Sequence, residues 1–223
     1  MYDLVVRGGS VVDGTGAPAR TADVAVADGR IAEIGRVDGV ARRTVDADGL
    51  VVTPGFVDIH THYDGQATWD PHLTPSCWHG VTTAILGNCG VGFAPVAVDR
   101  RDWLIELMEG VEDIPGSALA EGIRWEWESF DEYLDALERM PRAIDVGAHV
   151  PHAAMRAYVM GARAQDPATA DDLEVMQEIV RSALRSGALG VSTGRTAGHR
   201  DVHGEPVPGT FAADGRRVLR RAT

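Results

Sequence analysis

The pattern of apolar and polar positions divides the chain near residue 54. Before that point, short apolar runs alternate with glycine-containing turns, and the runs are residues 4–6, 10–12, 24–26, 31–34 and 51–52. The Asp28-Gly29 pair between two of these runs is a strong signal for a tight hairpin. Gly8-Gly9 separates the first two runs in the same way. Residues 1–53 are therefore predicted to form a small β-domain.

After residue 53, apolar runs alternate with segments of helical periodicity. The runs lie at residues 54–60, 81–86, 144–149 and 188–192. Their continuous apolar character is typical of parallel strands that are covered on both faces. The alternation of strands with helices favours βα units and a parallel sheet.

Two helices between these strands carry clear end signals. Ser129-x-x-Glu132 is a capping box that starts the first helix, and Pro141 follows its end. A second helix is expected to start near Thr169, and Gly187 stands where a C-terminal cap belongs. Residues 111–128 are interpreted as an insertion after the second strand, either a lid or a surface loop with packed aromatic side chains.

Four βα units in sequence fit the first half of an eight-stranded TIM-like (β/α)8 barrel, in which the active site lies at the carboxyl ends of the strands. Such a barrel takes about 250 residues. Only 170 of the 223 residues follow residue 53. The predicted fold class is therefore α/β, with the N-terminal part of a small β-sandwich domain in residues 1–53 and a partial barrel in residues 54–212.

Residues 54–62, Pro-Gly-Phe-Val-Asp-Ile-His-Thr-His, are the most informative for function. Because side chains alternate along a strand, Asp58, His60 and His62 are expected to face one side of the first barrel strand. Gly87-Asn88-Cys89-Gly90 directly follows the second strand and puts a thiol at the neighbouring strand end. Neutral imidazole and thiolate are preferred ligands of zinc, so these residues indicate a metal site.

Composition narrows the class of function. The net charge of -12 and the pI near 5.0 argue against nucleic acid or an anionic membrane as the main partner. The sequence shows no signal-peptide pattern, no apolar run of about 18 residues and no disulfide framework, so we expect a cytoplasmic protein. The chain contains no lysine, which excludes Schiff-base chemistry and carboxylated-lysine metal bridges.

These motifs carry a family resemblance. Residues 55–62 resemble the first-strand signature of the amidohydrolase superfamily, and residues 8–14 resemble its opening β-domain. Residues 80–90 are similar to the N-acyl-D-amino-acid deacylase (D-aminoacylase) branch, which uses a cysteine as a metal ligand. Residues 151–156 and 187–193 resemble further segments of that branch, and the resemblance runs from about residue 2 to residue 212.

The resemblance implies a zinc-dependent hydrolase of amide bonds that deacylates small-molecule N-acyl-D-amino acids by metal-bound hydroxide. It implies that His60 and His62 are metal ligands at one position and that Cys89 binds, or bridges, at a tightly bound zinc, with room for a second, weaker site. In the intact family two further histidines from later strands complete the set. The family's proton-shuttling aspartate comes from the last strand, so no catalytic residue is assigned in this chain. Two alternatives stay open: a cyclic-amide hydrolase of the dihydropyrimidinase or hydantoinase type, and a non-catalytic metal-binding fragment.

Other residues are weaker candidates. His152 follows the third strand at the expected active-site face, where a substrate contact and a structural hydrogen bond are both open. Arg195 follows the fourth strand, and its guanidinium suits a substrate carboxylate. Residues 213–223 carry four arginines in six positions and depart from the family pattern. We expect a truncated or frameshifted chain, and the sequence leaves its oligomeric state open.

Overall fold

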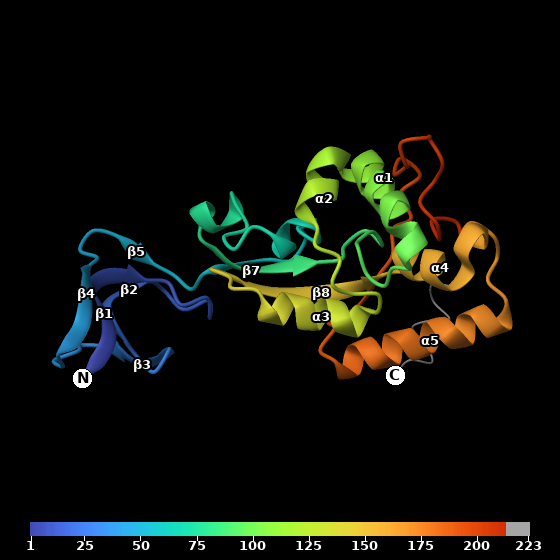
Figure 1. Ribbon diagram of the computed structural model, residues 1–223. Helices are drawn as coiled ribbons and strands as arrows, with labels where there is room; N and C mark the ends of the chain where they lie inside the picture. Colours follow the sequence, from blue (N-terminus) through green and yellow to red (C-terminus); the bar gives the residue numbers. More distant parts are fainter. Residues whose placement is uncertain (213–223) are drawn as a thin grey trace. The chain divides into compact units, whose positions relative to one another are not determined.

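The computed structural model describes residues 1–212 and divides into two compact units (Figure 1). The first unit is Met1–Gly55, and the second begins at Phe56. The predicted arginine-rich tail, residues 213–223, lies outside the described residues. Within the described part of the chain, no helix is both long and apolar enough to cross a membrane.

The first unit is a five-stranded sheet. Its strands are β1 (Tyr2–Val11), β2 (Arg20–Ala27), β3 (Arg30–Gly35), β4 (Ala41–Asp46) and β5 (Val51–Val52). The order is β3-β2-β1-β4, and β5 pairs with the end of β1. The antiparallel hairpin of β2 and β3 turns at Asp28-Gly29, where both residues have positive φ, as the sequence predicts. Val5, Ala25 and Val37 form the small core of this unit.

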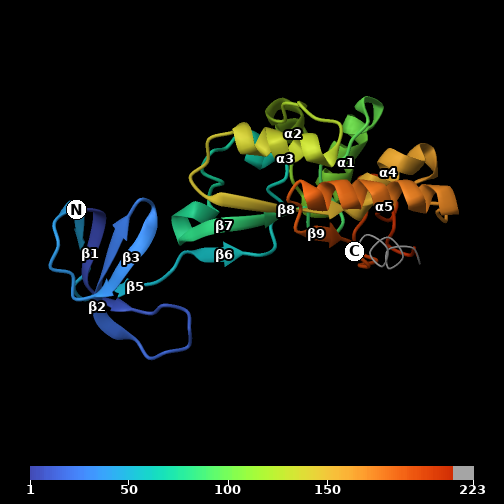
Figure 2. The same ribbon diagram turned by 90° about the horizontal axis from the view of Figure 1, so that it is seen from below.

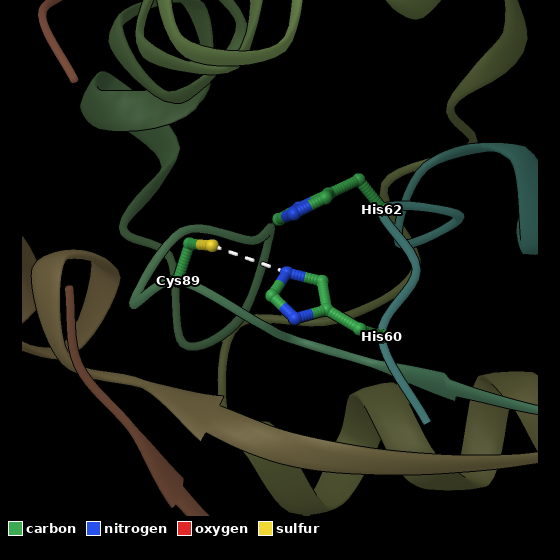
Figure 3. Close-up of side chains that lie close together, drawn as sticks. All are labelled: His60, His62 and Cys89. Atoms are coloured by element: carbon green, nitrogen blue, oxygen red, sulfur yellow. Dashed lines mark hydrogen bonds between the residues drawn. The ribbon is translucent and has the colours of Figure 1, made fainter. Parts of the chain in front are cut away.

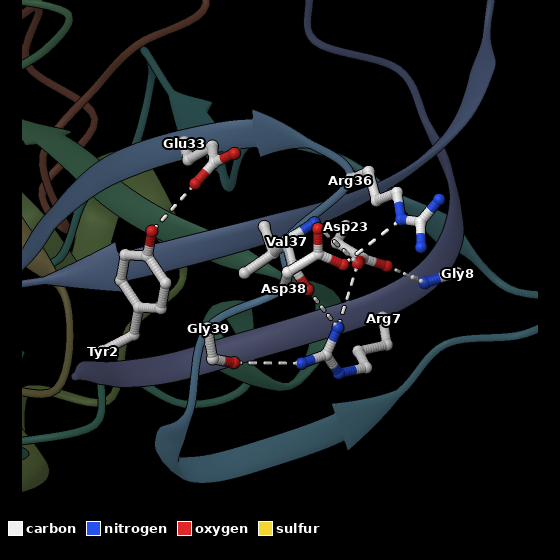
Figure 4. A network of polar contacts seen from close by, with 9 residues as sticks. All are labelled: Tyr2, Arg7, Gly8, Asp23, Glu33, Arg36, Val37, Asp38 and Gly39. Atoms are coloured by element: carbon white, nitrogen blue, oxygen red, sulfur yellow. Dashed lines mark hydrogen bonds and ion pairs between the residues drawn. The ribbon is translucent and has the colours of Figure 1, made fainter.

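β1 runs through Gly8-Gly9 without turning, which corrects the prediction of two separate strands. A register shift between Val6 and Gly9 marks a bulge, and Gly8 has φ +68°. At this bulge the Gly8 N–H donates to Asp23 Oδ1 at 2.8 Å, and Asp23 also accepts from Arg7 Nη1 at 3.1 Å (Figure 4). These donors, first of all the Gly8 N–H, lower the pKa of Asp23. The two glycines therefore serve a bulge that binds a carboxylate.

The second unit contains four parallel strands in the order β6-β7-β8-β9. Their bounds are β6 (Phe56–Asp58), β7 (Val81–Leu86), β8 (Asp145–Pro151) and β9 (Gly190–Ser192). Each strand pairs in parallel with the next one in the chain. The predicted fold class is thereby confirmed: this unit is a parallel half-barrel of the α/β class.

β6 differs from its prediction in two respects. The strand ends at Asp58 instead of residue 60, and Phe56 and Val57 are 60% and 56% exposed, so it is not covered on both faces. Among the described strands it has one neighbour, β7. The Asp58 carboxylate accepts the His60 N–H at 3.2 Å, which turns the chain out of the strand. His60 and His62 consequently lie in the loop after β6.

Five α-helices accompany this sheet in the described chain. They are α1 (Arg101–Glu112), α2 (Gly116–Gly122), α3 (Phe130–Arg139), α4 (His152–Met160) and α5 (Ala170–Arg185). The capping box of Ser129 and Glu132 starts α3, as predicted, and Thr169 caps α5 together with Asp172. Figures 1 and 2 both show α3 and α5 side by side, and Ser182 Oγ on α5 donates to Asp131 Oδ2 on α3 at 2.6 Å.

Aromatic side chains fill the core between the strands and α3. Trp127 is 3% exposed and donates its indole N–H to the Phe93 carbonyl at 2.7 Å. Tyr133, also buried, packs against Trp127 and donates its hydroxyl to the Asp64 carbonyl at 2.9 Å. Of the two interpretations of residues 111–128, the structure favours packed aromatic side chains. The hydrogen bond from Tyr133 to Asp64 thereby attaches the loop after β6 to α3.

Candidate metal centre

The loop after β6 is anchored by the residue between its two histidines. Thr61 is 7% exposed, its N–H donates to the Ile85 carbonyl at 3.1 Å, and its hydroxyl donates to the same carbonyl at 2.8 Å. Because Thr61 points inward to β7, its neighbours His60 and His62 project from the other side of the loop. Their rings lie 5.4 Å apart between centroids.

The loop after β7 depends on unusual backbone conformations. Gly87, Cys89 and Gly90 all have positive φ, at +72°, +55° and +80°. A Cβ on Gly87 would come within 2.1 Å of the His149 carbonyl oxygen, so this position accepts only glycine. Asn88 is buried and donates to the carbonyls of Thr61 at 3.1 Å and Ile85 at 2.8 Å. The Gly-Asn-Cys-Gly sequence therefore ties the two loops together and leaves the Cys89 side chain free to point to the histidines.

The two loops bring three predicted ligands together. Cys89 Sγ lies 3.2 Å from His60 Nε2, and one donor atom from each of His60, His62 and Cys89 lies within 4.8 Å of the others (Figure 3). His62 Nδ1 is buried and has no hydrogen-bond partner among residues 1–212. Two imidazoles and a thiol are a donor set that suits zinc. The residues present therefore fit a metal ion.

A carboxylate from α1 lies beside this group. Glu112 Oε1 is 3.2 Å from His62 Nε2, with 20% and 13% of the two side chains exposed. Burial, aided by the charges of His60 and His199, lowers the pKa of His62 to about 4, so its imidazole is neutral at pH 7 and the contact is not a salt bridge there. Burial also raises the pKa of Glu112, and burial together with the charge of Glu112 raises that of Cys89. Burial disfavours the negative charges of the Glu112 carboxylate and the Cys89 thiolate, and a bound cation would stabilise both.

Asp64 is a second carboxylate, two residues after His62, and it is almost fully buried. It is 2% exposed, and its Oδ2 has no hydrogen-bond partner within the described chain. Burial raises its pKa to about 7, opposed by the backbone N–H groups of Asp64 and Gly87. A Cβ on Gly92 would come within 2.7 Å of Asp64 Oδ1, so the carboxyl fits tightly against that loop.

The other two predicted residues lie outside the group of three. His152 is 1% exposed, and its Nδ1 is 3.1 Å from the Thr193 hydroxyl, which is a structural contact of the kind weighed in the sequence. Arg195 is exposed, and its guanidinium donates to the Ala212 carbonyl at 2.7 Å. Both remain predictions as substrate-binding residues.

Sequence reasoning missed Asp64 and Glu112. The pattern could have indicated Asp64, because it lies two residues after His62 and continues the series of Asp58, His60 and His62 at every second residue. No pattern indicated Glu112, because α1 was not predicted and its last residue carries no motif. Only the folded chain shows that the end of α1 reaches His62.

The fold and the site define a class of protein. A half-barrel of parallel strands with His-x-His after its first strand and a cysteine after its second is the arrangement expected of an amidohydrolase. Residues 43–219 match the model of the amidohydrolase family, and the chain belongs to that family.

Several of the proteins most similar to this chain are deacylases by name. The D-aminoacylase of Alcaligenes xylosoxydans xylosoxydans is 39% identical over 194 residues, which cover 86% of this chain and 38% of that protein. The crystal structure of a D-aminoacylase matches with a TM-score of 0.80 and 36% identity, over 99% of this chain and 43% of that one. N-acyl-D-glutamate deacylase from Bordetella bronchiseptica, in complex with zinc and a phosphonate inhibitor, matches with a TM-score of 0.73 and 36% identity, over 86% and 38%. The chain thus spans about two fifths of the length of these relatives.

Proposed function

We propose that the chain binds zinc through His60, His62 and Cys89, and that this metal serves hydrolysis of the amide bond of N-acyl-D-amino acids. The observation that carries the proposal is the convergence of the three donor groups within 4.8 Å. The likeness to deacylases, one of them a zinc complex, supports the reaction and the metal. A second, weaker metal position is part of the proposal, because D-aminoacylase has a binuclear metal centre.

The chain's own residues prepare the site. Thr61 and Asn88 fix the two ligand loops from the inside, so the donor groups need little reorganisation. Zinc supplies Lewis acidity and lowers the pKa of bound water from about 15.7 to about 7. The Cys89 thiol must lose its proton to bind, and because burial raises its pKa, binding releases a proton and strengthens as pH rises. Arg195, exposed three residues after β9, is proposed to pair with the substrate carboxylate.

Zinc content tests the metal site directly. We expect one tightly bound zinc per chain by mass spectrometry of the dialysed protein. Cys89→Ser should lose this zinc, because the site loses its thiolate. Cys77→Ser is the matched control, since Cys77 is the other free and partly buried cysteine and lies outside the donor group. Equal zinc content in wild type and Cys89→Ser would contradict the proposal.

Product release tests the reaction. Free amino acid should appear from N-acetyl-D-amino acids in the presence of zinc, and the L-enantiomers should be poor substrates. Turnover of hydantoins or dihydropyrimidines instead would favour the cyclic-amide reading. Zinc binding without turnover of either substrate class would favour the non-catalytic metal-binding fragment.

A further inference from the structure

The last residue of α1 is held in a fixed position beside the metal centre. Leu104, Leu107 and Met108 bury one side of the helix in the core. The helix ends at Glu112, because Asp113 takes the left-handed conformation (φ +54°) and its N–H bonds the Glu109 carbonyl at 3.0 Å. The helix therefore ends with Glu112 beside His62.

Glu112 lies nearly as close to His62 as two ligands of one ion lie to each other. Donors bound to zinc at about 2.0–2.3 Å and at the tetrahedral angle stand roughly 3.3–3.8 Å apart. His60 Nε2 and Cys89 Sγ are 3.2 Å apart, and Glu112 Oε1 and His62 Nε2 are also 3.2 Å apart. Among residues 1–212, the group within 4.8 Å contains the two histidines and the cysteine alone, so Glu112 approaches it from the His62 side.

A loop covers α1 at Gly110, two residues before Glu112. A Cβ on Gly110 would come within 2.4 Å of the Asp201 carbonyl carbon and 2.6 Å of the Arg200 carbonyl oxygen, so only glycine allows this approach. His199 belongs to the same loop, and its Nδ1 is buried without a hydrogen-bond partner in residues 1–212. The close crossing explains why a glutamate at the end of a helix is only 20% exposed. A carboxylate that is largely removed from water competes well for a cation.

We propose that Glu112 is a fourth protein ligand of the metal held by His60, His62 and Cys89, and that it gives up this place to water when the metal serves hydrolysis. A rotation of its side chain brings the carboxylate onto the ion from the α1 side. Two neutral imidazoles, one thiolate and one carboxylate then carry two negative charges, which balance a divalent cation. This inference rests on the proposed metal site and adds a ligand that no sequence motif indicates.

Glu112→Gln tests the ligand, because it keeps the shape of the side chain and removes its charge. Glu106→Gln is the matched control: Glu106 lies on the same helix and its Oε2 is 3.5 Å from His203 Nε2, outside the metal group. Removal of an outer partner of a ligand already costs about 10–100-fold in metal affinity. We therefore expect the zinc dissociation constant of Glu112→Gln to rise at least tenfold, and that of Glu106→Gln to stay within about twofold of wild type.

Cobalt substitution supplies a second measurement that a structural role would not change. The visible absorption of bound Co²⁺ reports the ligand set, so it should differ between wild type and Glu112→Gln and be unchanged in Glu106→Gln. Glu112→Asp should fall between wild type and Glu112→Gln in affinity, and it replaces the glutamine variant if that variant does not fold.

Each other outcome counts against the proposal. Weaker zinc binding with an unchanged Co²⁺ spectrum would make Glu112 a positioning residue for His62 and overturn its role as a ligand. Unchanged affinity would remove any role in metal binding. Zinc binding that is lost in Cys89→Ser but kept in Glu112→Gln sinks this inference alone, whereas a wild-type chain that binds no zinc sinks the proposed site with it.

Discussion

Protonation of Asp64 is expected to control the pH dependence of stability. Its folded-state pKa is about 7, against an ordinary value of 3.8, and burial is the main cause. Between these two values the folded chain holds a proton that the unfolded chain has lost. Stability from this group is therefore complete below about pH 4 and is lost as pH rises toward and through 7. Asp64→Asn removes the titration with little change of shape.

The size of the effect follows from the shift. A difference of about three pKa units, at about 1.4 kcal/mol each, corresponds to about 4 kcal/mol between pH 4 and pH 8. In Asp64→Asn the side-chain amide takes the place of Asp64 Oδ2, which has no hydrogen-bond partner in the described chain. The unpaired amide lowers the free energy of unfolding of the variant by about 1–3 kcal/mol at every pH. The diagnostic quantity is thus the change with pH of the difference between the two proteins.

Urea unfolding of the metal-free chain at several pH values measures this difference. The free energy of unfolding of Asp64→Asn minus that of wild type should rise by about 4 kcal/mol from pH 4 to pH 8. Asp172→Asn is the control, because its contact with Arg163 helps to lower the pKa of Asp172 to about 2, so the stability it contributes is lost only as pH falls through that range. A difference for Asp64→Asn that stays constant within about 1 kcal/mol would refute the reasoning.

Two further substitutions test the elements around the site. Ser129→Ala removes the hydrogen bond that Ser129 Oγ accepts from the Glu132 N–H. It should lower the free energy of unfolding in urea titrations by about 1 kcal/mol. Ser117→Ala, at an exposed serine, is the control and should change it little. Gly87→Ala and Gly14→Ala both strain a residue with positive φ by about 1–2 kcal/mol, but only at Gly87 does the new Cβ clash, with the His149 carbonyl. Gly87→Ala should therefore be the more destabilising and should weaken zinc binding; equal losses would show that the clash does not matter.

Local signals in the sequence predicted much of the fold. Capping residues placed the starts of α3 and α5, because a side chain that satisfies helix N–H groups acts within three residues. The apolar run at residues 81–86 coincides with β7, a central strand. Strand ends at the sheet edge were less well predicted, and β4 was missed because its Ala-Arg-Arg-Thr-Val-Asp sequence lacks an apolar run. Its place depends on parallel pairing with β1, which no local pattern encodes.

The candidate site divides in the same way. His60, His62 and Cys89 belong to short motifs, so the sequence could predict that they share a strand-end face. In the structure, strand alternation does not bring them together, because β6 already ends at Asp58. The loop after β6 is instead attached to β7 by the hydrogen bond from Thr61 to the Ile85 carbonyl. The sequence could not show that Glu112 and Asp64 lie at the candidate site, because Glu112 reaches His62 only through the fold and Asp64 is distinguished by its burial.

The positions of these donors separate metal binding from turnover. His60, His62 and Cys89 lie in the loops after β6 and β7, and Thr61 and Asn88 join those loops through bonds to the Ile85 carbonyl. In the proposed site, metal affinity would depend on these neighbouring loops and on Glu112 at the end of α1, so it should respond to changes there. Turnover also needs substrate contacts and proton transfer, and the chain spans about two fifths of the deacylases that it resembles. Zinc affinity is for this reason the sharper test of the structure, and N-acyl-D-amino acid hydrolysis is the sharper test of the family assignment.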